Sequence, residues 1–131
     1  MLMFSSCAKK ESDSNPIIPQ EPTTIEQVER MDRDTTDATV NGDPEMVGIV
    51  LAQWRDTLKE FMATDKLPTN RIRRCMAMTC GRLSLLQTKI GNTSRAEDYM
   101  SEAMQYGQGQ HDIDTEEKLL QVIYSQVRKE N

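Results

Sequence analysis

Aromatic residues are scarce in this chain, which has two phenylalanines, three tyrosines and one tryptophan among its 131 residues. Apolar residues make up 37% of the sequence, so only part of the chain can form a packed core. Nine methionines combined with few aromatic side chains favour helices over sheets. No apolar run approaches the roughly 20 residues that a membrane-spanning helix needs.

The chain also lacks a basic excess. Residues 8–43 contain four basic and nine acidic side chains, whereas residues 44–131 contain twelve of each. The net charge of −5 therefore lies in the first third of the sequence. Because nucleic-acid-binding domains usually have more basic than acidic residues, we expect no nucleic-acid partner.

Groups that support catalysis or metal binding are equally few. His111 is the only histidine, and with Asp112 and Asp114 it would form a poor metal site. Cys75 and Cys80 lie five residues apart on a predicted helix, with α-carbons roughly 8–9 Å apart, too far for a disulfide. The sequence has no phosphate-binding glycine loop, no nucleophile elbow and no paired catalytic carboxylates. We therefore predict no enzymatic activity, cofactor, metal or small-molecule substrate.

What the chain does have begins with the stretch MLMFSSC, in which apolar residues and two serines precede Cys7. This stretch resembles the lipobox of bacterial lipoproteins. The resemblance implies cleavage before Cys7, so that residues 1–6 are a signal-peptide remnant and the thiol carries lipid. Several acyl chains would make a stable membrane anchor. The protein would then lie in the bacterial cell envelope, facing the periplasm or the exterior.

The resemblance departs from a full signal peptide, which has a basic region and roughly 7–15 apolar residues. Either the start lies inside a longer signal, or Cys7 belongs to an ordinary terminus of a cytoplasmic protein. Residues 7–43 are predicted to be the lipid-anchor cysteine followed by a disordered acidic tether, because three prolines and many acidic residues disfavour packing. Thr24 and Gln27 form a capping-box pattern there, and Ile25, Val28 and Met31 follow at helical spacing. A short helix over residues 24–31 is therefore either transient or docked on the domain.

Residues 44–131 are predicted to form an all-α domain, a helical-hairpin array of about four helices. Asp43-Pro44-Glu45 is a strong helix start, and apolar residues at three- and four-residue steps predict a helix from Pro44 to about Ala63. A second helix, 69–90, has two apolar faces and is expected in the middle of the domain. A third is expected to start at Ser94 or Thr93 and to end at Gly107, and a fourth to start near Asp114.

The segment from Gly81 to Gly107 resembles a tetratricopeptide repeat, a pair of helices in which small residues allow close approach. The matching residues are Leu83, Ser84, Gly91, Ala96, Met100 and Ala103. Gln87 and Gln108 depart from the motif, and no second copy is convincing. The resemblance implies a protein-binding scaffold without chemistry of its own.

A basic stripe on the second predicted helix is the candidate partner-binding face. It consists of Arg71, Arg74, Arg82 and Lys89, beside Met78 and Leu85. These cations either pair with Glu60 and Asp65 of the preceding helix, or dock an acidic partner or lipid headgroups. The sequence thus predicts a lipid-anchored envelope protein whose helical domain binds another, unknown envelope protein. The alternative is a soluble cytoplasmic helical adaptor with a disordered N-terminal arm.

Overall fold

The protein is described by a computed structural model that covers residues 22–127, and this part of the chain is all-α. Five helices follow one another, and their bounds are α1 Ile25–Asn41, α2 Pro44–Thr64, α3 Thr69–Ile90, α4 Thr93–Tyr106 and α5 Glu116–Ser125. The predicted signal remnant, Cys7 and the tether up to residue 21 lie outside the described residues, as do residues 128–131.

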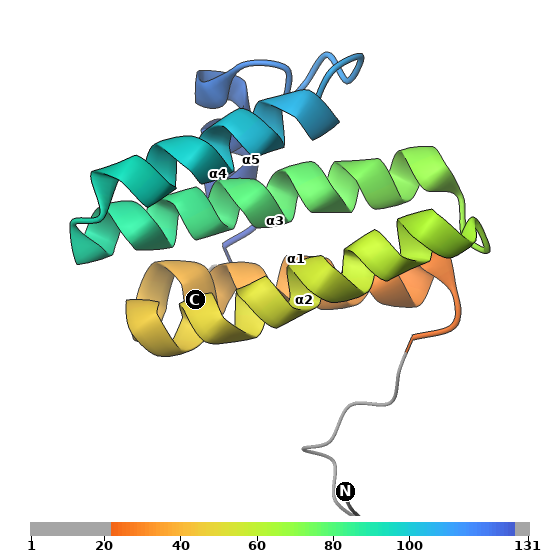
Figure 1. The fold of residues 1–131 in the computed structure, drawn as a ribbon, viewed down its shortest axis with the longest axis horizontal. Coiled ribbons are helices and arrows are strands. Elements are labelled where there is room, and N and C mark those ends of the chain that lie inside the picture. Colours follow the sequence, from red (N-terminus) through yellow and green to blue (C-terminus); the bar gives the residue numbers. More distant parts are fainter. Residues whose placement is uncertain (1–21, 128–131) are drawn as a thin grey trace, which may run out of the picture.

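Helix α3 is the central element of the array. It packs against each of the other four helices, and α1 also packs against α2. Figure 1 shows α1 and α2 on one side of α3, and α4 and α5 on the other. The prediction that a helix with two apolar faces lies in the middle of the domain is confirmed. Nearly all of α3 from Cys75 to Leu86 is buried as a result.

Helix α1 corrects the predicted extent of the tether and the predicted number of helices. Thr24 and Gln27 form a complete capping box, and the helix continues to Asn41, well past Met31. Val28 is fully buried against α2 and α3, in a cluster with Leu58 and Ile72. Residues 25–41 are therefore part of the folded domain, and the array has five helices where about four were expected.

The boundaries of α2 and α3 agree with the local sequence signals. The Asp43 side chain accepts a hydrogen bond from the Met46 amide, and Pro44 occupies the first turn. Gly91 ends α3 with φ of 91°, a left-handed conformation that glycine adopts at little cost. The caps of the last two helices differ from the prediction, because Asn92 and Thr115 supply the capping oxygens instead of Ser94 and Asp114.

Close approach of α5 to α3 depends on Gly81. A β-carbon at this position would lie 2.8 Å from Leu119 Cδ2 and 2.9 Å from Ile123 Cδ1, closer than side chains pack. Leu119 and Ile123 are both fully buried in a cluster that also contains Met78 and residues of α4. The missing side chain thus lets the apolar face of α5 rest directly on α3.

Candidate functional site

The predicted partner-binding stripe is only partly exposed in this structure, since Arg71 and Lys89 are exposed but other members are buried. Arg82 is fully buried and Met78 is only 2% exposed, because α1 and α5 pack over this side of α3. This corrects the prediction for both residues. The physical reason is that α1, which was predicted to be part of the tether, covers the face of α3 that the sequence pattern predicted to be exposed to solvent.

The remaining cations of the stripe are bound within the domain. Arg71 forms an ion pair with Glu29 of α1, with a nitrogen–oxygen distance of 2.6 Å, and its hydrogen bond holds the pKa of Glu29 below the usual value. Arg74 pairs with Asp112 at 2.7 Å. Lys89 donates to main-chain carbonyls in the last turn of α1. Arg71 and Arg74 therefore form ion pairs within the domain, although the predicted partners Glu60 and Asp65 are wrong. Lys89 instead binds the carbonyl end of α1.

Arg82 belongs to a buried polar network centred on Asp32, which is 3% exposed. One carboxylate oxygen of Asp32 accepts hydrogen bonds from the Trp54 indole at 2.9 Å and the Thr79 hydroxyl at 2.7 Å. The other accepts from the Arg82 guanidinium at 3.0 Å. The network therefore joins α1, α2 and α3.

The rest of the Arg82 guanidinium is also satisfied. Its Nε donates to the Thr36 hydroxyl at 2.9 Å, and its second terminal nitrogen donates to the side-chain oxygen of Gln126 at 2.8 Å. Thr36 in turn donates to the same Gln126 oxygen. Because the charge of Arg82 is matched and its nitrogens are bonded within the domain, this cluster holds the helices together.

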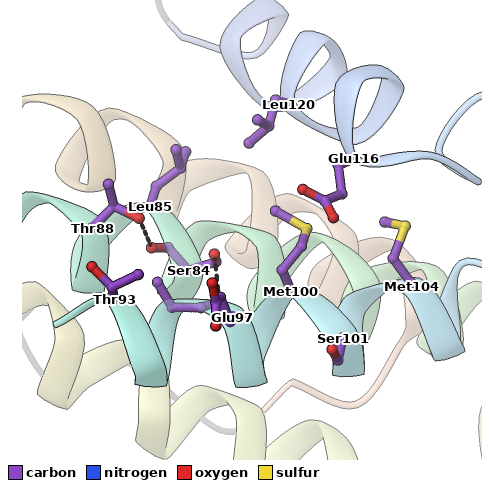
Figure 2. Close-up of a pocket in the computed structure, with 11 residues that line it drawn as sticks. Ser84, Leu85, Thr88, Thr93, Glu97, Met100, Ser101, Met104, Glu116 and Leu120 are labelled. Carbon is purple, nitrogen blue, oxygen red and sulfur yellow. Dashed lines mark hydrogen bonds between the residues drawn. The ribbon is translucent and has the colours of Figure 1, made fainter.

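A groove with a volume of about 760 Å³ lies between α4 and α5. Helices α4 and α5 each pack on α3 but make few direct contacts with each other, so the groove opens between them. Its floor is formed by α3 and its two banks by α4 and α5 (Figure 2). It is lined by Ser84, Leu85, Thr88, Thr93, Ala96, Glu97, Met100, Ser101, Met104, Glu116 and Leu120.

Polar groups at the floor of the groove are already bonded within the domain. The Ser84 hydroxyl donates to the Ala96 carbonyl at 2.8 Å, which ties α3 to α4. The Thr88 hydroxyl donates to the Ser84 carbonyl at 3.0 Å, and both bonds are visible in Figure 2. The floor can therefore contact apolar groups without leaving these hydroxyls unpaired.

Apolar side chains from all three helices meet in this groove. Leu85, Met104 and Leu120 are half-buried, and Met100 is buried with one edge at the groove. Methionine is common at surfaces that bind varied partners, because its flexible thioether adapts to the partner's shape. Leu85 is the one residue of the predicted partner-binding set that lines the groove. The other lining residues were missed because the groove depends on the position of α5 relative to α4, which no local pattern specifies.

The two described thiols show no features of a nucleophile. Cys75 and Cys80 are both buried and unbridged. Burial raises the pKa of the Cys75 thiol well above its usual range and that of Cys80 to about 12. A thiol attacks as the thiolate, so these cysteines are unreactive in the folded domain. Residues 22–127 contain no group of three or more histidine, cysteine or carboxylate side chains arranged to hold a metal.

A second exposed apolar area lies at the start of α2. Met46, Ile49 and Val50 are 65%, 62% and 58% exposed. None of the five helices of the described chain is both long and apolar enough to span a membrane.

Helices α3 and α4, the pair that resembles a tetratricopeptide repeat, pack closely against each other. Leu83 and Ala103 are almost completely buried, and Gly91 makes the turn between the helices. The family assignment of this pair stays a prediction. Comparison of the chain with protein-family models, curated protein sequences and solved structures gives no match.

Proposed function

We propose that this protein is a lipid-anchored component of the bacterial cell envelope whose helical domain binds another protein through the α4–α5 groove. The groove is the observation that supports this proposal. It combines a concave shape, half-buried leucine and methionine side chains and a floor whose hydroxyl groups are already satisfied. Its lining consists of five apolar residues, four hydroxyl residues and two glutamates. Binding sites commonly combine apolar surface with placed polar groups that orient the partner.

The anchor is proposed from the stretch MLMFSSC, in which Cys7 would carry the lipid. Under this proposal the domain is held at the membrane by the segment that precedes Pro22. The alternative is a soluble cytoplasmic adaptor that uses the same groove. Mass spectrometry of the native protein distinguishes the two, because only the lipoprotein lacks residues 1–6 and carries lipid mass on Cys7.

Copurification from detergent-solubilised cells tests the groove. Ser101 is exposed on the α4 bank, so Ser101→Trp fills the groove without disturbing a buried side chain. Ala63→Trp, at an exposed position on α2 outside the groove, is the matched control. We expect the wild type and Ala63→Trp to retain the same partner, and Ser101→Trp to lose it while its melting temperature is unchanged. A partner that both variants retain would exclude the groove as the binding site.

A further inference from the structure

We infer that the α4–α5 groove binds a basic partner segment, that is, a short peptide stretch with apolar side chains flanked by lysine or arginine. This inference rests on the proposed function and adds the chemistry of the partner. It follows from the charges that line the groove, from the apolar side chains beside them and from the positions at which the rest of the chain joins the domain.

The charged side chains that line the groove are all acidic. Glu97 lies on the α4 bank and Glu116 on the α5 bank, and no lysine, arginine or histidine lines the groove. Both glutamates are exposed, and neither has an ion-pair partner among residues 22–127. Elsewhere in the domain, acidic side chains such as Glu29, Glu102 and Asp112 are paired with arginines.

A cationic partner side chain on either bank would therefore meet a carboxylate that is free to bind it. Complementary charge of this kind selects partners and raises the rate of association. Figure 2 shows Met100 between the two glutamates, with Met104 further along α4 and Leu120 on α5, and these three side chains can cover an apolar partner side chain. Apolar side chains beside one carboxylate on each bank thus fit a segment that combines apolar side chains with lysine or arginine.

We infer a separate molecule as the occupant, because both ends of the described range lie away from the groove. Pro22 lies beside Thr57 and Phe61 of α2, next to a cavity distinct from the groove. At the other end, the Gln126 side chain is bonded to Thr36 of α1 and to Arg82. Figure 1 shows α3 between α1 and α2 on one side and the α4–α5 pair on the other. Neither end of the described chain leads into the groove.

Two synthetic peptides of about 14 residues, which as helices would match the roughly 21 Å length of α4, serve as probes. Both have the same leucine, methionine and alanine centre, and one has lysine flanks whereas the other has glutamate flanks. Binding to the full-length chain with Cys7→Ser is measured by fluorescence anisotropy. We expect the lysine peptide to bind, the glutamate peptide not to bind, and binding to weaken as salt rises toward about 1 M, where the screening length falls to about 3 Å.

The double variant Glu97→Gln/Glu116→Gln should raise the Kd of the lysine peptide about 3- to 10-fold, as expected for two exposed ion pairs. Its matched control is Asp98→Asn/Glu45→Gln, which removes the same charge from α4 and from the first turn of another helix, outside the groove. If the control raises the Kd equally, attraction to the net negative charge explains the binding and the inference is wrong.

Other outcomes also overturn the inference. Equal binding of both peptides would show that charge does not select the occupant. Binding of neither peptide would show that the groove does not accept such a segment. Loss of binding in Ile49→Lys but not in Ser101→Trp would assign binding to the apolar area of α2. A concentration-dependent dimer in sedimentation, abolished by Ser101→Trp, would identify the occupant as a second copy of the chain.

The copurification experiment separates this inference from the proposed function. If the native complex is lost in Ser101→Trp but unaffected by salt and by the glutamate double variant, the groove binds a protein and the inference of a basic segment is wrong. If the complex survives Ser101→Trp, the proposed function itself is wrong.

Discussion

The buried ion pair between Arg82 and Asp32 allows a quantitative test of how this domain is held together. Replacing Arg82 by methionine keeps an unbranched apolar side chain but removes the guanidinium and its charge. Asp32 would then stay in the interior with the Trp54 and Thr79 hydrogen bonds and no cation. Removing one partner of a buried pair typically costs about 3–5 kcal/mol, since the other charge is left uncompensated. Asp32→Asn should cost a similar amount, because the guanidinium then lacks its anion.

The double variant Asp32→Asn/Arg82→Met tests the cause of this cost. With neither charge present, no uncompensated ion is left in the interior, so the double variant should be about as stable as either single variant or more stable. The two single costs therefore should not add, and the coupling between the two sites should reach about 3 kcal/mol. Residues that share one buried network are those for which additivity fails.

Urea unfolding of the full-length chain with Cys7→Ser measures these free energies. Trp54 is the only tryptophan, and its indole is bonded to Asp32, so its fluorescence reports on the network. Far-UV circular dichroism gives an independent signal that the substitutions do not alter directly. The matched control is Arg74→Met, which breaks the partly exposed pair with Asp112 and should cost less than about 1 kcal/mol.

The reasoning would be refuted if Arg82→Met cost no more than Arg74→Met. It would also be refuted if the double variant lost the sum of the two single costs. In the first case the buried charge would be accommodated by water, and in the second the two side chains would contribute independently.

Other predictions concern packing, thiol reactivity and pH. Gly81→Ala should lower the free energy of unfolding by about 1 kcal/mol in urea titrations, since crowding against α5 outweighs a gain in helix propensity of about 1 kcal/mol. Cys75 and Cys80 should react with a disulfide reagent at about pH 8 only as fast as the domain unfolds, because burial raises the pKa of both thiols; fast labelling in the native state would contradict this. Arg74 holds the pKa of Asp112 below its ordinary value of 3.8, so their pair stabilises the fold above about pH 4 and is lost as the pH falls through the lowered pKa. The deficit of Asp112→Asn, at most about 1 kcal/mol, should therefore be constant near neutral pH and vanish in acid, as measured by urea midpoints at several pH values.

Local signals in the sequence are sufficient to predict the central part of the fold. Asp43 and Pro44 begin α2, and Gly91 ends α3, because each acts through its own backbone conformation and needs no distant partner. The two apolar faces of α3 also predict its central position, since each face must be covered by a neighbour. Both predictions agree with the structure.

Helix α1 was underestimated because its inner face is largely polar. Its buried positions are Ile25, Val28, Asp32, Thr36 and Thr39, which follow the spacing of one helical face. An analysis that counts only apolar residues stops at Met31. The regular three- and four-residue spacing of small polar side chains after Val28 is the signal that could have extended the helix to Asn41.

The position of Arg82 could not be predicted for a related reason. A cation on a helix surface is usually solvated, and its burial becomes favourable only when an anion and further acceptors surround it. Those groups come from Asp32 and Thr36 of α1 and from Gln126 after α5, which are at least 44 residues away in sequence. The groove could not be predicted for the same reason, because it depends on α4 and α5 packing on different faces of α3, and no local pattern specifies those positions.

The polar network and the groove lie on different sides of α3. Under the proposed function, the membrane anchor and the bound partner would therefore act on opposite sides of the domain. The described chain begins at Pro22 beside α2, whereas the groove opens between α4 and α5 (Figure 1). An anchor at Cys7 would pull on the α1–α2 side, where Arg82 and Asp32 join α1 to α3 through charged hydrogen bonds. The groove opens on the side of α3 away from α1 and α2 (Figure 1), so a partner would bind there while the domain is held from the opposite side.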